Sequence, residues 1–190
     1  MPKRKGPLPR FATIHVQMAL DQLAKEKRIG RKEIAERLGI GEGSVRTILN
    51  HLKKNGLITS SRGGHSLTSK GARAMGQPPK FVQVKMGDLA VGKVNVATIV
   101  RGASAKVKRG IEQRDEAIKA GADGATVLLF ERGKFKFPDS FFDVPRETSE
   151  VLIKALKPRE GDVVVIGTSS DALRAEVGAR AAARSITISG

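Results

Sequence analysis

The 190-residue sequence predicts a protein of the α+β class, in which a mainly helical part precedes a part built on a largely antiparallel sheet. Apolar residues recur at helical spacing between residues 11 and 76, and a Pro-Pro pair then interrupts the chain at residues 78–79. From residue 81, strand and helix patterns follow in the order β-β-α-β-β-α. We therefore expect a disordered basic arm at 1–10, a helical domain at 11–76 and an α+β domain at 81–190.

Positive charge is concentrated in the first part of the chain. The net charge is +16, and residues 1–80 account for +12 of it because they carry 17 Lys and Arg against 5 Asp and Glu. A basic surface can serve solubility alone, but this uneven distribution favours a module that binds a polyanion.

The composition argues against several classes of function. The chain has no cysteine, which excludes disulfides, thiolate catalysis and zinc fingers, and its three histidines are widely spaced, so we expect no metal and no cofactor. No apolar run approaches the ~20 residues that cross a bilayer, and the first residues lead into no apolar signal core. We expect a cytoplasmic protein without a membrane partner.

The helical domain is organised around residues 40–52. Val45, Ile48, Leu49 and Leu52 recur at i, i+3, i+4 and i+7, so one stripe of this helix is apolar. Helices are predicted at residues 11–27, 31–38, 42–55 and 69–75, strands at 57–59 and 66–68, and a hairpin tip at 60–65. Three helices, a hairpin and a closing helix together predict a winged helix-turn-helix.

Four stretches carry a resemblance to a known family: Glu33-Ile34-Ala35-Glu36-Arg37-Leu38-Gly39-Ile40, Ser44-Val45-Arg46, Gly56-Leu57-Ile58 and Leu67-Thr68-Ser69-Lys70-Gly71. They resemble the winged-helix domains of prokaryotic transcriptional regulators of the MarR, PadR and IclR kinds. The resemblance implies binding of double-stranded DNA as a homodimer, although some winged helices bind RNA or protein.

Carried over by position, the resemblance assigns DNA-binding roles on the third helix and the hairpin. Base edges or flanking phosphates would be met by Ser44, Arg46, Thr47 and Asn50. Arg62 at the hairpin tip would reach the minor groove or a phosphate, and charge independent of sequence would come from Lys53, Lys54 and Lys70. Glu42 suits the positive end of the helix dipole, and it could also accept a hydrogen bond from a cytosine amine.

The second domain is expected to form a two-layer sandwich of an antiparallel sheet with helices on one face. Counted from Val94, the same order of elements would instead be ferredoxin-like, and the sequence does not separate the two topologies. Strands are predicted at residues 81–85, 94–100, 125–130, 135–137, 163–166 and 186–188, and helices at 109–120, 147–156 and 171–184.

Two stretches of this domain are candidate ligand sites. The backbone of Gly167, Thr168, Ser169 and Ser170, between a buried strand and a helix, could hold a small anionic effector, although capping of the helix by Thr168 or Ser169 is the commoner outcome. The helix with Arg114 and Asp115, which precedes a Gly-Ala-Asp-Gly-Ala segment, resembles that of archaeal two-domain winged-helix proteins. These two side chains would either pair or line a ligand site.

These patterns lead to one preferred function and one alternative. We expect a DNA-binding transcriptional regulator with a C-terminal effector-binding or dimerisation domain, and not an enzyme, because no nucleophile–base spacing or carboxylate pair stands out. The alternative is an RNA-binding or translation-associated protein, which the basic arm and a cluster of five phenylalanines between Phe130 and Phe142 would favour. Core filling is the commoner use of such phenylalanines.

Overall fold

The computed structural model describes residues 13–75, 79–90, 92–138 and 142–188. The chain divides into two compact units, residues 1–78 and 79–190, and each unit has its own core. The basic arm predicted at residues 1–10 and most of the linker lie outside the described residues.

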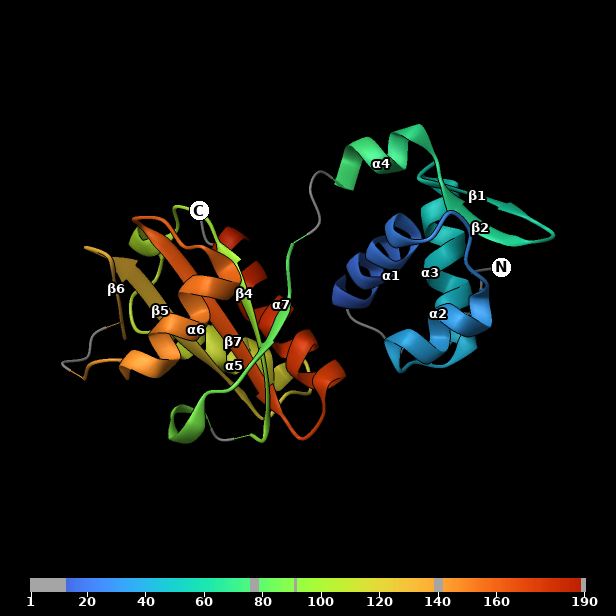
Figure 1. Cartoon of the computed structure of the whole chain (residues 1–190). Helices are drawn as coiled ribbons and strands as arrows, with labels where there is room; N and C mark the ends of the chain where they lie inside the picture. The colour runs from blue at the N-terminus through green and yellow to red at the C-terminus, as the bar shows by residue number, and fades with distance from the viewer. Residues whose placement is uncertain (1–12, 76–78, 91, 139–141, 189–190) are drawn as a thin grey trace, which may run out of the picture. The chain divides into compact units, whose positions relative to one another are not determined.

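Unit 1 contains its helices and hairpin in the order that the sequence predicts (Figure 1). The predicted bounds of the second helix, residues 31–38, are confirmed, and the first helix ends at Lys25, two residues before its predicted end. Its elements are α1 (Thr13–Lys25), α2 (Arg31–Leu38), α3 (Glu42–Lys54), β1 (Ile58–Ser61), β2 (Gly64–Leu67) and α4 (Ser69–Met75).

Local sequence explains where α2 ends and α3 begins. Gly39 adopts a left-handed conformation (φ 63°), and the backbone N–H groups of Gly39 and Ile40 donate to the last carbonyls of α2. Gly41 then takes the N-cap position of α3 with no side-chain cap. On α3, Val45, Ile48, Leu49 and Leu52 are all buried, and a buried side chain of this size contributes about 1.5–3 kcal/mol.

Unit 2 is an antiparallel five-stranded sheet packed against helices, so the predicted α+β class is confirmed. The strand order is β3-β4-β7-β5-β6, and each neighbouring pair is antiparallel. Its elements are β3 (Val82–Val84), β4 (Val94–Val100), α5 (Ile111–Lys119), β5 (Gly124–Glu131), β6 (Lys134–Lys136), α6 (Arg146–Leu156), β7 (Asp162–Ser169) and α7 (Ala172–Ile188).

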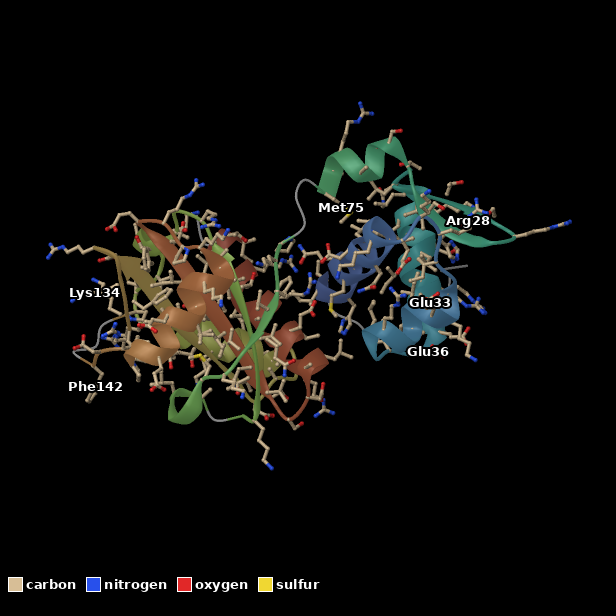
Figure 2. The ribbon with its side chains drawn as sticks, in the orientation of Figure 1. Arg28, Glu33, Glu36, Met75, Lys134 and Phe142 are labelled. Atoms are coloured by element: carbon tan, nitrogen blue, oxygen red, sulfur yellow. The ribbon has the colours of Figure 1, made fainter. Side chains whose placement is uncertain are left out.

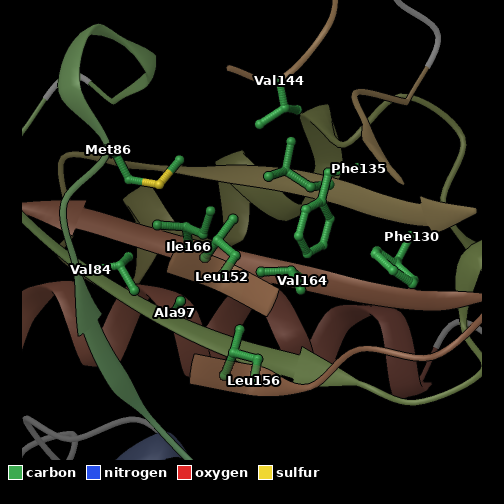
Figure 3. Close-up of a cluster of buried hydrophobic side chains, with 11 residues drawn as sticks. Val84, Met86, Ala97, Phe130, Phe135, Val144, Leu152, Leu156, Val164 and Ile166 are labelled. Atoms are coloured by element: carbon green, nitrogen blue, oxygen red, sulfur yellow. The ribbon is translucent and has the colours of Figure 1, made fainter. Parts of the chain in front are cut away.

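Helices cover both faces of this sheet, which corrects the expectation of helices on one face (Figure 1). Val164 and Ile166 of β7 point into a core closed by α6 (Figure 3), whereas Val163 and Val165 point into a second core closed by α7. Alternate side chains of a strand point to opposite faces, so the unbroken apolar run of β7 supplies both cores. The strand order also excludes the ferredoxin-like alternative, in which β6 would lie between β4 and β5, because β7 occupies that position.

Helix α7 continues where the sequence predicts a final strand at residues 186–188, and that prediction is wrong. Ile186 is fully buried in the core that α7 closes, so tertiary packing overrides the β-branched residues at this end. The helix also lies very close to β7, because a β-carbon on Gly167 would stand 2.1 Å from the Ala175 carbonyl oxygen.

Candidate nucleic-acid interface

Helix α3 has two chemically different sides. Its apolar side is buried in unit 1, and its opposite side carries exposed polar or cationic residues, among them Arg46, Thr47, Asn50, Lys53 and Lys54. Within the part of the chain that the structure describes, the side chains of Arg46, Asn50, Lys53 and Lys54 form no hydrogen bond or ion pair. Thr47 differs, because its hydroxyl donates to the Gly43 carbonyl at 3.1 Å, and Ser44 is half-buried.

The hairpin of β1 and β2 places Arg62 at an exposed turn. A third segment supports this hairpin, because Ile29 and His65 exchange backbone hydrogen bonds of 3.0 and 2.9 Å. His65 Nδ1 also lies 2.9 Å from the Ser60 hydroxyl across the hairpin. The connection between α1 and α2 therefore fixes the hairpin beside the helices.

Arg28, which no sequence pattern indicates as a site residue, lies against the same hairpin (Figure 2). A β-carbon on Gly63 would stand 2.9 Å from Arg28 Nη1. A β-carbon on Gly64 would stand 2.7 Å from the Ile29 carbonyl oxygen, and Gly64 has a φ of +121°, which side-chain-bearing residues rarely adopt. The two glycines thus let a cation from another segment approach the hairpin backbone, and only the fold reveals this approach.

Positive charge from two helices, α2 and α3, acts on His65. Partial burial lowers the pKa of His65 below its ordinary value of 6.5, and the charges of Lys53 on α3 and Arg31 on α2 lower it further. Lys53 was predicted as a site residue, whereas Arg31 was not. Lys53 and Arg31, together with Arg28 against the hairpin and Arg62 at its turn, are referred to as the basic cluster of unit 1.

Two charged residues of the predicted interface have partners within unit 1. The Glu42 carboxylate accepts a hydrogen bond from Arg31 Nε at 3.0 Å, so an internal cation already engages this acid at the start of α3. The Lys70 ammonium donates to the Asn55 carbonyl oxygen at 3.0 Å, at the end of α3. Lys70 therefore satisfies a carbonyl group of a helix end, which is a structural role.

The predicted anion-binding segment of unit 2 is largely enclosed. Gly167, Thr168 and Ser169 are buried, and the Thr168 hydroxyl accepts a hydrogen bond from the Gly92 backbone at 2.8 Å, whereas Ser170 is exposed. The carboxylate of Asp171 caps α7 by accepting from the Arg174 backbone at 2.9 Å. The carboxylate of Asp171 thus occupies the position at the start of α7 where an anion would bind. Asp171 also provides the helix cap that was expected of Thr168 or Ser169.

The other candidate residues of unit 2, Arg114, Asp115 and the phenylalanines, do not form one site. Among the described residues, Arg114 and Asp115 form no ion pair, because neighbouring positions on a helix face different directions. Arg114 lines a cavity, and Asp115 does not. Phe130 and Phe135 pack edge-to-face in the core with ring centroids 5.0 Å apart, so these two phenylalanines fill the core, and Phe142 is 81% exposed.

Two further findings concern the described residues. They contain no group of three His, Cys, Asp or Glu side chains that could hold a metal ion. None of their helices combines the length and the apolar character that a membrane-spanning segment requires.

Comparisons with known proteins cover both parts of the chain. The family model described as "Domain of unknown function (DUF4443)" matches residues 91–186, and the model described as "PH0730-like, N-terminal domain" matches residues 17–73. Among solved structures, the chain is similar to "Hypothetical protein PH0730 from Pyrococcus horikoshii OT3", with 31% sequence identity and a TM-score of 0.73 over 94% of each chain. No curated protein matches the chain. The expected resemblance to archaeal two-domain proteins agrees with this neighbour.

Proposed function

The chain belongs to the DUF4443 family, and we propose that its N-terminal unit is a winged helix that binds duplex DNA, so that the protein acts as a transcriptional regulator. One observation carries the proposal. The side of α3 that faces away from the core presents Arg46, Asn50, Lys53 and Lys54 without internal partners among the described residues. A helix with such a side fits the major groove, which is about 12 Å wide.

We assign roles by chemistry and position on α3. Arg46 and Asn50 have side chains that can form two hydrogen bonds with a base edge, and they lie on the same exposed side. Lys53 and Lys54, at the end of the helix, suit phosphates. Thr47 would contact a phosphate or a base with the oxygen lone pairs that its internal hydrogen bond leaves available.

The basic cluster of unit 1 extends the proposed contact surface. Arg28, Arg31 and Arg62 belong to the loop before α2, to α2 and to the hairpin turn, and together they would follow a phosphate backbone or enter the minor groove. The net charge of +12 on residues 1–80 supports strong attraction to a polyanion. Because Glu42 is held by Arg31, the first turn of α3 offers few groups for reading bases, which favours strong binding over tight sequence discrimination.

A homodimer would complete the proposed mode of binding. Two copies related by a twofold axis would place their α3 helices in half-sites about 34 Å apart, one DNA turn. Unit 2 is the part that we assign to dimerisation or to binding an effector, because unit 1 supplies the DNA contacts.

Selection of bound sequences from a random duplex pool, followed by fluorescence anisotropy across a salt series, tests this function. Arg46→Ala should weaken binding to the selected duplex by about 1–3 kcal/mol and reduce its preference over random duplex. Lys53→Ala should weaken binding to both duplexes and lower the slope of log K against log[salt] by about 0.9. Lys154→Ala on α6, which removes an exposed charge from unit 2, should leave both properties unchanged.

The same measurement distinguishes DNA from the RNA alternative. A structured RNA that competes with duplex DNA at lower concentration than unlabelled duplex would replace the DNA proposal with an RNA-binding function. Unchanged duplex binding in both Arg46→Ala and Lys53→Ala would show that α3 is not the contact surface.

A further inference from the structure

Unit 2 contains a cavity of about 560 Å³ that the DNA-binding proposal does not use. Pockets for small organic ligands range from about 300 to 1,000 Å³, so this volume suits a small molecule. The described residues that line it come from the segment between β3 and β4, from β5, from the start of α5 with the residues just before it, and from the segment between β6 and α6.

The cavity exists because two paired strands differ in length. β5 spans Gly124–Glu131, but β6 pairs only with its last three residues, Leu129, Phe130 and Glu131. Among the described residues, the first part of β5 therefore has no neighbouring strand on that edge. Ala125, Thr126 and Val127 line the cavity along this open edge, where backbone groups can meet a ligand.

Most of the wall is apolar. Leu89, Ile111, Val127 and Phe137 contribute hydrocarbon surface from four different segments. Phe142 also lines the cavity while 81% of it remains exposed, and Ile111 is 52% exposed. A ligand that covers these exposed apolar side chains removes their surface from water. This burial stabilises the complex by about 25 cal/mol per Å² of apolar surface.

The charged groups at the cavity favour an anion. Among the described residues that line it, the charged side chains are those of Arg109, Arg114 and Asp143, which sum to a charge of +1. Across the described residues, Arg114 has no hydrogen-bond or ion-pair partner. A guanidinium can bind both oxygens of a carboxylate, which makes it well suited to organic acids.

The start of α5 adds a second, weaker attraction for an anion. Gly110 and Ile111 line the cavity, and α5 begins without a side-chain cap, in contrast to α7, which Asp171 caps. Gly110 has a φ of +79°, and a β-carbon there would stand 3.2 Å from Val127 Cβ, so glycine allows α5 to begin close to β5. The uncapped N–H groups of this first turn favour negative charge.

We propose that this cavity binds a small organic acid with an apolar body. Its carboxylate is held by Arg114 and lies near the start of α5, while its apolar body covers Ile111, Val127 and Phe142 at the open edge of β5. This inference is independent of DNA binding, because it concerns unit 2 alone.

Calorimetric titration of the full chain with 2-naphthoate, decanoate and the neutral 2-naphthamide tests the proposal. At least one acid should bind, and naphthoate should bind about tenfold or more tightly than naphthamide, as expected for a charge-assisted hydrogen bond. Inorganic phosphate, which has no apolar body, should bind more weakly than the better acid.

Variants locate the site. Arg114→Gln should weaken binding of the better acid about tenfold and leave naphthamide unaffected, because it removes only the charge. Ile111→Glu, at a half-exposed position that tolerates a polar side chain, should weaken binding of the acid, because the new carboxylate repels the carboxylate of the ligand. The control Lys154→Gln removes a charge from a residue that does not line the cavity and should have no effect.

Three outcomes would overturn the proposal: no binding of either acid, equal binding of naphthoate and naphthamide, or acid binding that both Arg114→Gln and Ile111→Glu leave intact. Phosphate binding as tight as that of the acids would show that the apolar wall of the cavity does not contribute to binding. Circular dichroism of each variant separates loss of binding from loss of fold.

Discussion

The guanidinium of Arg31, at the start of α2, donates to the carboxylate of Glu42, at the start of α3, across 3.0 Å. This pair joins the two helices that a helix-turn-helix must hold in a fixed relation. It also neutralises the only acid on α3 and engages a cation of the basic cluster. Both side chains are between 40% and 46% exposed, so the pair contributes at most about 1 kcal/mol to stability and matters more for charge.

Glu42→Gln should strengthen binding to random duplex DNA with little change in stability. The substitution removes a negative charge from the proposed interface and releases Arg31, which can then reach a phosphate and steepen the salt slope by about 0.9. Anisotropy across a salt series measures this change. Glu36→Gln removes an exposed acid from α2 and serves as the control. An equal effect of both variants would mean that the net charge of unit 1, and not the position of Glu42, determines the change in binding.

Lys70→Met should destabilise unit 1 without changing the salt dependence of DNA binding. The ammonium of Lys70 donates to the Asn55 carbonyl at the end of α3, and loss of such a hydrogen bond costs about 0.5–1.5 kcal/mol. Urea unfolding and anisotropy measure the two properties. Lys54→Met should show the opposite pattern, with a lower salt slope and a smaller loss of stability, because Lys54 is exposed and has no partner among the described residues. A lower salt slope for Lys70→Met would assign Lys70 to the phosphates after all.

The stability of unit 1 should fall as the pH drops below 6.5, the ordinary pKa of histidine. Burial and the charges of Lys53 and Arg31 lower the pKa of His65 in the folded state, so the unfolded chain binds its proton first. Protonation therefore favours unfolding, and the stability that His65 contributes above its unfolded pKa is lost as the pH falls toward the folded pKa.

Urea unfolding at a series of pH values checks this prediction. His65→Gln should flatten the pH dependence of the unfolding free energy around 6.5, whereas His51→Gln, at an exposed position of α3, should preserve it. An unchanged pH profile in His65→Gln would mean that other groups cause the loss of stability.

Local sequence patterns predict much of the fold because they act over short distances. The glycine after Leu38 and the apolar spacing of α3 locate two helices of unit 1, and the strand predicted at residues 94–100 has the bounds of β4. The unbroken apolar run of β7 already contains the signal that both faces of the sheet are covered, since its alternate residues enter different cores.

Part of the candidate interface could likewise be predicted, because a helix places residues three or four positions apart on the same side. This spacing is enough to put Arg46, Asn50, Lys53 and Lys54 opposite the buried stripe. It cannot reveal that Glu42 meets Arg31, which is 11 residues away, or that Arg28 lies against Gly63, because those contacts depend on how helices and hairpin pack.

The sequence by itself therefore determined the α+β class, most elements of both units and the polar side of α3. The tertiary structure alone decided that residues 186–188 continue α7, that Asp171 caps that helix, and that Arg114 lines a cavity at the open edge of β5. The physical reason is the range of the interactions. Periodicity and capping act within a few residues, whereas burial of Ile186 and the unequal lengths of β5 and β6 arise only when distant segments pack together.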